Sequence, residues 1–212
     1  MQENLDSRLW KSNSLLCGVD EVGRGALAGP VVAAAVILAP HTRIVGVRDS
    51  KKLSPAQRVR LAKKIRRRAL CWAIGAASHR FIDRHNIHQA TFQAMRRAIA
   101  RLSVRPSLVV ADGWKIPELD LPCQGIFQGD NRSLSIACAS IVAKVYRDQL
   151  MARFDSRFPG YQFAQHKGYA TPGHLRALQN LGASPIHRGS FEPVRRIVNQ
   201  RVPVRGHNRS GL

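Results

Sequence analysis

Residues 18–25 of the chain read GVDEVGRG: an apolar run ends in two adjacent carboxylates, Asp20 and Glu21, and a glycine-rich turn follows. The pair is unusual in this chain, which has 34 lysines and arginines against 13 aspartates and glutamates. Adjacent carboxylates among apolar residues repel each other and lose hydration, so they need protons or cations. In a basic protein, such a pair is suited to holding a divalent metal ion beside a phosphate backbone.

The length and composition describe a basic globular protein. Its 212 residues suit one domain, or a domain with a small appendage, and a hydrophobic content of 44% is enough for a core. The formal net charge of +21 and the pI near 11.4 indicate a polyanionic partner, most simply nucleic acid. Charge alone does not distinguish DNA, RNA and an anionic membrane surface.

The cysteines and apolar runs indicate a reducing compartment and no membrane span. No apolar run reaches the ~18 residues of a membrane-spanning helix, and the polar N-terminus lacks the apolar region of a signal peptide. We therefore expect a cytoplasmic protein with a flexible segment over residues 1–14 and a basic, disordered tail over residues 201–212. Four cysteines lack C-x-x-C spacing and read as small buried residues: Cys17, Cys71, Cys123 and Cys138.

Hydrophobic periodicity predicts an α/β domain whose helices pack on a central sheet. A Ser54-Pro55 helix start opens a very basic helix, which we interpret equally as a duplex-binding face or a solvated one. Apolar, β-branched runs predict strands over residues 15–19, 30–38, 71–77, 108–111 and 125–128. Helical spacing and caps predict helices over residues 54–69, 87–102, 135–154 and 172–181.

Four acids share one context, because each directly follows a strand-like run and lies beside or near glycine. Functional groups gather at strand ends in open α/β sheets. Four converging carboxylates would suit two Mg²⁺ or Mn²⁺ ions about 3.5–4 Å apart, which activate water for attack on phosphorus. Oxygen ligands without a His/Cys cluster favour these ions over zinc. The four acids are Asp20, Glu21, Asp112 and Asp130.

Each of these acids also has a simpler interpretation. Asp-Gly is an ordinary turn signal, which is the better reading of Asp112 or Asp130 taken alone. Side chains alternate along a strand, so Asp20 and Glu21 face one site only if the chain turns after Asp20. Among the other acids, we expect a helix salt bridge between Lys144 and Asp148. The remaining acids, including Asp6, fit a solvated surface.

A different class of enzyme is suggested by the glycine spacing. Gly23, Gly25 and Ala28 loosely match the G-x-G-x-x-A fingerprint of nicotinamide enzymes. That fingerprint must open a helix whose N-terminus meets pyrophosphate. Here Pro30 and a β-branched run follow instead, and the preceding carboxylates would repel pyrophosphate, so we discount this alternative.

Longer motifs, taken in order, resemble those of bacterial ribonuclease HII. The resemblance covers roughly residues 15–198 and includes several motifs in register. They are GVDEVGRG at 18–25, DSKKLS at 49–54, DG at 112–113, GD at 129–130, ASIVAKVYRD at 139–148 and HKGYAT at 166–171.

The resemblance implies a ribonuclease H-like fold, with a mixed central β-sheet flanked by α-helices, in a catalytic domain over residues 15–200. It implies endonucleolytic cleavage of RNA in RNA–DNA hybrids. It also implies cleavage on the 5′ side of single ribonucleotides in duplex DNA, leaving 5′-phosphate and 3′-hydroxyl ends. Such an enzyme removes misincorporated ribonucleotides and primer RNA. The four acids would be the metal ligands, for Mn²⁺ or Mg²⁺.

The resemblance also assigns roles in substrate recognition. The backbone of Gly23, Arg24 and Gly25 would read the ribose 2′-hydroxyl, the group that marks RNA. Tyr169 would stack on the deoxyribose that follows the ribonucleotide, although without its motif it would be read as a packing tyrosine. Further candidates for phosphate contacts are Ser50, Lys51, Lys52, Arg147, His166 and Lys167.

Two features depart from the family pattern. Gln128 stands where the family often has lysine, so one phosphate contact would be lost, and Cys138 lies in the alanine-rich helix. We expect a monomer that acts on nucleic acid without a membrane, and the sequence identifies no replication or repair partner. The main alternative is a non-catalytic basic protein of the same fold, which would bind hybrids without cleaving them.

Overall fold

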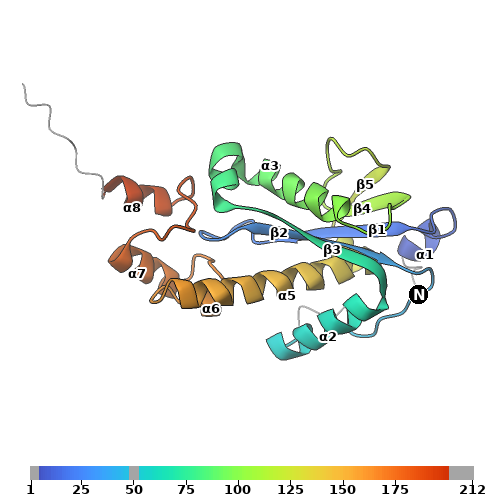
Figure 1. Ribbon diagram of the computed structural model, residues 1–212, viewed down its shortest axis with the longest axis horizontal. Helices are drawn as coiled ribbons and strands as arrows, with labels where there is room; N and C mark the ends of the chain where they lie inside the picture. Colours follow the sequence, from blue (N-terminus) through green and yellow to red (C-terminus); the bar gives the residue numbers. More distant parts are fainter. Residues whose placement is uncertain (1–4, 48–52, 201–212) are drawn as a thin grey trace, which may run out of the picture.

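The computed structural model describes residues 5–47 and 53–200, and its centre is a five-stranded sheet (Figure 1). The strand order is β3-β2-β1-β4-β5. β1 is antiparallel to β2, which is antiparallel to β3, while β1, β4 and β5 are parallel. The mixed sheet confirms the predicted fold class. The strands are β1 (Leu16–Val22), β2 (Val31–Leu38), β3 (Ala69–Ala77), β4 (Leu108–Asp112) and β5 (Cys123–Ile126).

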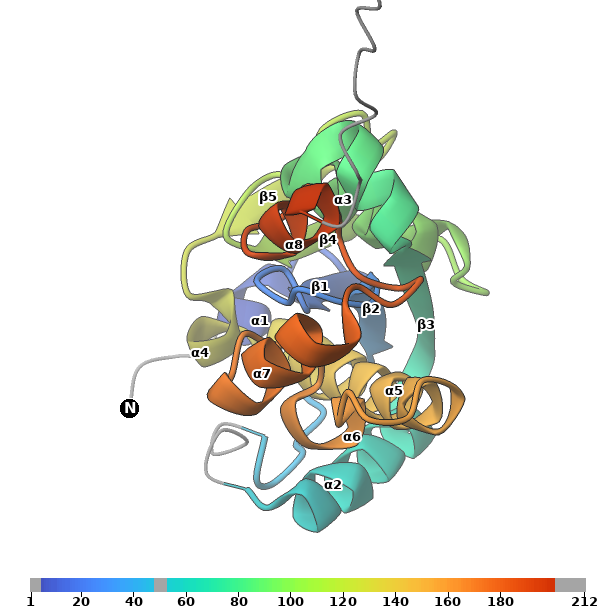
Figure 2. The ribbon, with the colours of Figure 1, turned by 90° about the vertical axis from the view of Figure 1, so that its left-hand side faces the viewer.

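Helices cover both faces of the sheet. Figures 1 and 2 show α5 and α2 on one face of the sheet and α3 on the other. The helices are α1 (Leu5–Leu9), α2 (Pro55–Arg68), α3 (His79–Ala100), α4 (Gly129–Arg132), α5 (Leu134–Arg157), α6 (Phe163–His166), α7 (Pro172–Leu181) and α8 (Val194–Gln200). None of the helices within the described residues is long and apolar enough to cross a membrane.

The two-residue period of β1 divides its side chains between two cores. Leu16 packs in the core beneath α5 and α2, whereas Cys17 and Val19 pack in the core beneath α3. Gly18 faces α5, and a Cβ at this position would lie 2.1 Å from the Ser135 carbonyl carbon. Glycine here lets the α5 backbone pack directly on β1, and Asp20 follows on the same face.

The predicted helix boundaries are confirmed in part. Ser54 caps α2 through a capping box, as its sequence indicates. The helix predicted over residues 87–102 begins earlier, at His79, because Ser78 provides a second N-cap. Asn86, with φ 73° and ψ 168°, interrupts the regular helix before Ile87. The predicted segment is therefore the second part of a longer, kinked element.

The expectation of a flexible segment over residues 1–14 is wrong for residues 5–10. Leu5–Leu9 form α1, and Trp10 is buried in the core beneath α5. Asp6, expected on the surface, is completely buried, and its Oδ2 accepts hydrogen bonds from the Ser135 backbone and hydroxyl at 2.8 and 2.7 Å. Asp6 therefore holds α1 against the start of α5.

Candidate metal and nucleic-acid site

The carboxylate pair lies at the carboxyl end of β1, beside the end of β4. Because Val19 is aligned with Ala111 in this parallel pair, Asp20 and Asp112 are neighbours across it. β1 continues to Val22 and the chain turns only at Gly23, so Asp20 and Glu21 both still lie within the strand. Strand alternation thus sends the two side chains of the pair to opposite sides, yet both remain close enough to Asp112 to sense its charge.

Burial makes the charges at this strand end costly. Asp20 is 6% exposed. Loss of hydration, with the nearby charges of Glu21 and Asp112, raises its pKa well above the usual range, although a Ser140 hydrogen bond opposes the shift. Burial also raises the pKa of Glu21, while its ion pair with Arg24 at 3.2 Å opposes that shift. A cation at this place would relieve the repulsion.

The third and fourth acids are connected through α4. The Gly129 backbone N–H donates to Asp112 Oδ1 at 2.6 Å. Asp130, the next residue, is half-buried in the first turn of α4. No three His, Cys, Asp or Glu side chains within residues 5–47 and 53–200 are already grouped to hold a metal. The all-oxygen donors and the raised pKa of Asp20 fit a hard divalent cation, whose binding would draw the carboxylates together.

The turn after β1 is shaped by Gly23, whose φ is +92°. A Cβ at Gly23 would lie 2.1 Å from Arg147 Nε, so only glycine fits over this buried side chain. Gly25 is exposed, with open space where a Cβ would stand, and Arg24 lies between them, in contact with both Glu21 and His88. The turn leads into β2, not a helix, which argues against dinucleotide binding.

Two buried arginines lie beneath this turn. Arg188 donates to the carbonyl oxygens of Gly29, Arg24 and Gly23 at 3.0, 2.7 and 2.6 Å. Burial and the charge of Arg147 lower the pKa of Arg188 to about 9. Because Arg188 binds three carbonyl oxygens of this turn, it restricts the backbone conformation of the turn.

Arg147 was predicted to contact phosphate, and the structure gives it a different position. Its side chain is completely buried and donates to the carbonyls of Pro30, Lys167 and Ala28 at 3.1, 2.9 and 3.2 Å. The guanidinium also lies 5.5 Å from the ring centroid of Tyr169. Arg147 therefore joins the β1–β2 turn to the segment that carries Tyr169, and direct phosphate binding is not supported.

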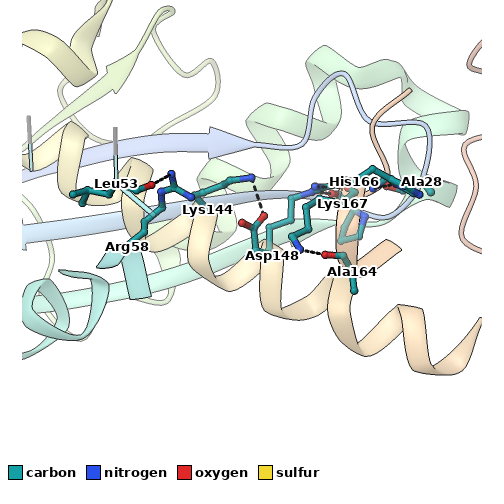
Figure 3. Close-up of polar contacts among 11 residues, drawn as sticks. Ala28, Leu53, Arg58, Lys144, Asp148, Ala164, His166 and Lys167 are labelled. Carbon is teal, nitrogen blue, oxygen red and sulfur yellow. Dashed lines mark hydrogen bonds and ion pairs between the residues drawn. The ribbon is translucent and has the colours of Figure 1, made fainter. Parts of the chain in front are cut away.

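The HKGYAT segment begins at the last residue of α6 and lies against the same turn. The Leu27 backbone N–H donates to the Gly168 carbonyl at 2.7 Å. His166 and Lys167 are half-buried and make local bonds, His166 Nε2 with the Tyr161 carbonyl at 2.6 Å and Lys167 Nζ with the Ala164 carbonyl. Figure 3 shows this Lys167 bond and the confirmed Lys144–Asp148 ion pair of 2.8 Å along α5.

Two buried histidines, His187 and His174, form a hydrogen-bonded series that ends at the backbone carbonyl of Tyr169. The Ser184 backbone N–H donates to His187 Nδ1 at 2.8 Å, so the proton of neutral His187 is on Nε2. That proton is donated to His174 Nε2 at 3.0 Å, and His174 Nδ1–H then donates to the Tyr169 carbonyl at 2.9 Å. Burial lowers the pKa of His174 to about 4 and, together with His174, that of His187 to about 3.

Comparison with known proteins identifies the family to which this chain belongs. A sequence profile described as Ribonuclease HII matches residues 17–194. The chain belongs to the ribonuclease HII family. It is 53% identical over 185 residues to ribonuclease HII of Dechloromonas aromatica, covering 87% of this chain and 94% of that relative. It is 55% identical to the enzyme of Thiobacillus denitrificans, covering 87% and 91% of the two chains.

Solved structures share the fold at lower identity. Ribonuclease H2 of Pyrococcus horikoshii superposes with a TM-score of 0.73 at 22% identity, covering 87% of this chain and 97% of that one. The ribonuclease HII of Archaeoglobus fulgidus, solved in complex with PCNA, gives 0.72 at 25% identity, with coverage of 84% and 95%. A ribonuclease HIII solved with Mn²⁺ gives 0.65 at 18%, with coverage of 92% and 72%.

As a member of the ribonuclease HII family, the chain is a ribonuclease. Most of the residues predicted for its site lie within the part of the chain that the structure describes. Ser50, Lys51 and Lys52 lie outside the described residues. Sequence reasoning missed the supporting roles of Arg188, His174 and His187. The position of His187 and Arg188 directly after the apolar Ile186 was the one local sign of burial for these two side chains. The groups that Arg188 binds lie far from it in the chain, so the sequence could not identify them.

Proposed function

We propose that this ribonuclease cleaves the RNA strand of RNA–DNA hybrids and cuts on the 5′ side of single ribonucleotides embedded in duplex DNA. The observation that carries the proposal is the buried carboxylate group at the ends of β1 and β4, directly beside the glycine turn of a ribonuclease HII family member. The products would carry 5′-phosphate and 3′-hydroxyl ends, and the role would be ribonucleotide removal and primer degradation.

Asp20, Glu21, Asp112 and Asp130 would hold the metal ions. A pair of Mg²⁺ or Mn²⁺ ions supplies an activated water and stabilises the leaving oxygen in phosphodiester hydrolysis. The ribonuclease HIII named above, which shares the fold, was solved with Mn²⁺, and this supports a site for a divalent metal ion.

The protein's own residues orient these carboxylates. Ser140 donates to Asp20, the Gly129 N–H fixes Asp112, and Arg24 restrains Glu21. The Glu21 backbone N–H also donates to Asp20 Oδ1 at 2.7 Å. A carboxylate has about four lone-pair sites, so lone pairs remain for metal ligation. We also propose that the protein acts as a monomer, with a single catalytic domain over residues 15–200.

Recognition of the RNA–DNA junction would come from the two segments joined by Arg147. The backbone of Gly23, Arg24 and Gly25 would bond the ribose 2′-hydroxyl, since Gly25 is exposed with open space around it. Tyr169, half-buried against Arg147, would place its ring on the next deoxyribose. We also propose a cytoplasmic location, in keeping with a DNA-bound substrate and four free cysteines.

The test is cleavage of a labelled RNA–DNA hybrid after chelation of metal, followed by addition of Mg²⁺ or Mn²⁺. We expect cleavage only with added metal, and none by Asp20→Asn. Asp120→Asn is the matched control, because the Asp120 side chain is fully exposed and pairs with Arg105 ahead of β4, whereas Asp112 lies at the other end of that strand. Hybrid binding without cleavage under either metal would instead indicate a non-catalytic binding protein.

A further inference from the structure

Two large aromatic side chains are exposed beside the carboxylates. Trp114 is 71% exposed and Phe127 is 74% exposed. Aromatic side chains of this size normally bury most of their surface, so two exposed rings near one place indicate a contact surface. Within the described residues, neither ring packs against another ring.

Backbone contacts fix both residues relative to Asp112. The Trp114 N–H donates to the Asp112 carbonyl at 3.1 Å, and the Gly113 N–H donates to the Ile126 carbonyl at 2.9 Å. Phe127 directly follows Ile126, and two residues later the Gly129 N–H bonds the Asp112 carboxylate. The two residues therefore follow the carboxyl ends of the neighbouring parallel strands β4 and β5, which Figure 1 shows side by side in the sheet.

The loop that follows β4 also packs tightly on β5. A Cβ at Gly125 would lie 2.4 Å from the Lys115 nitrogen and 2.6 Å from the Trp114 carbonyl carbon, so the backbones are in direct contact. Lys115 is exposed next to Trp114. The surface therefore combines two apolar rings and a cation on a rigid support, next to the acids that would carry out hydrolysis.

We propose that Trp114 and Phe127 form an aromatic contact surface for the nucleic acid, packing against sugars and bases next to the cleaved phosphate. Aromatic rings bind nucleic acids by stacking, and a neighbouring lysine suits the phosphate. A net charge of +21 and the adjoining carboxylates favour nucleic acid over a protein partner. This inference rests on the proposed function and extends it.

The position of this surface complements that of Tyr169. Tyr169 lies on the side of the β1–β2 turn, over Arg147. Trp114 and Phe127 follow β4 and β5, which lie on the other side of β1 from β2 in the strand order. A duplex whose scissile phosphate lies at the carboxylates would thus meet aromatic rings on both sides.

Tryptophan fluorescence gives a direct test of binding. The chain has three tryptophans; Trp10 is 8% exposed and Trp72, at 37%, lies beneath Arg66. A duplex with one ribonucleotide is titrated into Asp20→Asn protein, with and without the additional change Trp114→Phe. We expect quenching on binding that Trp114→Phe removes for the most part. Equal fluorescence changes in the two proteins would overturn the proposal.

Cleavage kinetics give the second test. Trp114→Ala and Phe127→Ala should each raise KM about tenfold, with a much smaller effect on kcat. Leu181→Ala, which removes another exposed apolar side chain on α7, should leave KM unchanged. KM values within twofold of the wild type for both aromatic variants would refute the surface. If the wild type itself neither binds nor cuts the duplex, the proposed function fails first.

Discussion

Asp20 shows how one residue can serve function at a cost in stability. Its carboxyl group is buried beside two other acids, and this environment raises its pKa. Because the pKa in the folded protein lies above that of the unfolded chain, Asp20 weakens the fold once the pH rises through the folded value. The fold tolerates this cost at neutral pH, which is the usual exchange of stability for activity.

Asp20→Asn should therefore stabilise the metal-free protein while it abolishes turnover. The amide keeps the side-chain size and removes the charge, so we expect the free energy of unfolding at pH 7.5 to rise by about 1 kcal/mol. Denaturant unfolding in the presence of a chelator measures this. Mn²⁺ should then stabilise the wild type more than the variant. A variant clearly less stable than the wild type would contradict the cost assigned to the charge.

At the scale of the element, the β1–β2 turn is stabilised by Arg188, which lies 165 positions after Gly23 in the chain. Arg188→Ala removes three donors to buried carbonyls, so we expect a loss of about 3 kcal/mol in unfolding free energy. Arg195→Ala, which removes an exposed partner of Glu192, should cost less than about 1 kcal/mol. Similar unfolding midpoints for the two variants would show that the turn does not depend on Arg188.

The segment behind Tyr169 should be sensitive to acid. The lowered pKa values of His174 and His187, about 4 and about 3, mean that the unfolded chain takes up protons before the folded protein does. Stability should therefore fall as the pH decreases from about 6.5 towards 4, by up to about 1.4 kcal/mol per pH unit per histidine.

Urea unfolding at pH 7, 5.5 and 4.5 measures the slope of the unfolding free energy against pH. His187→Gln should make the slope shallower, whatever its effect on stability at pH 7. His85→Gln, which changes an exposed histidine, should leave the slope unchanged. An equal slope in wild type and His187→Gln would mean that the buried histidine chain is not the source of acid sensitivity.

Elements with strong local signals were predictable from the sequence. α7 has the predicted boundaries, because Thr171 caps its start and Gly182 ends it. The short helices α1, α4, α6 and α8 were missed, since four to seven residues give too little periodicity. The candidate acids were found because carboxylates after apolar strands are rare in this chain. The role of Arg188 depends on contacts between distant segments, which no local pattern encodes.

At the scale of the whole molecule, the charge of +21 should govern substrate affinity. A protein that contacts 6–10 phosphates loses about 10³–10⁵ in affinity between 50 and 200 mM salt. We expect a comparable, linear fall of log affinity with log salt for Asp20→Asn binding a hybrid duplex. Fluorescence anisotropy measures it. A salt-independent affinity would show that the basic surface does not meet the substrate.

The most direct test of the account is cleavage of duplex DNA that carries one ribonucleotide, with Mg²⁺ or Mn²⁺, against the same duplex without it. We predict a single cut on the 5′ side of the ribonucleotide, with 5′-phosphate and 3′-hydroxyl ends, and no cut in all-DNA duplex or with Asp20→Asn. Cleavage of both duplexes, or equal cleavage by Asp20→Asn, would contradict the assignment of the carboxylates and of the turn beside them.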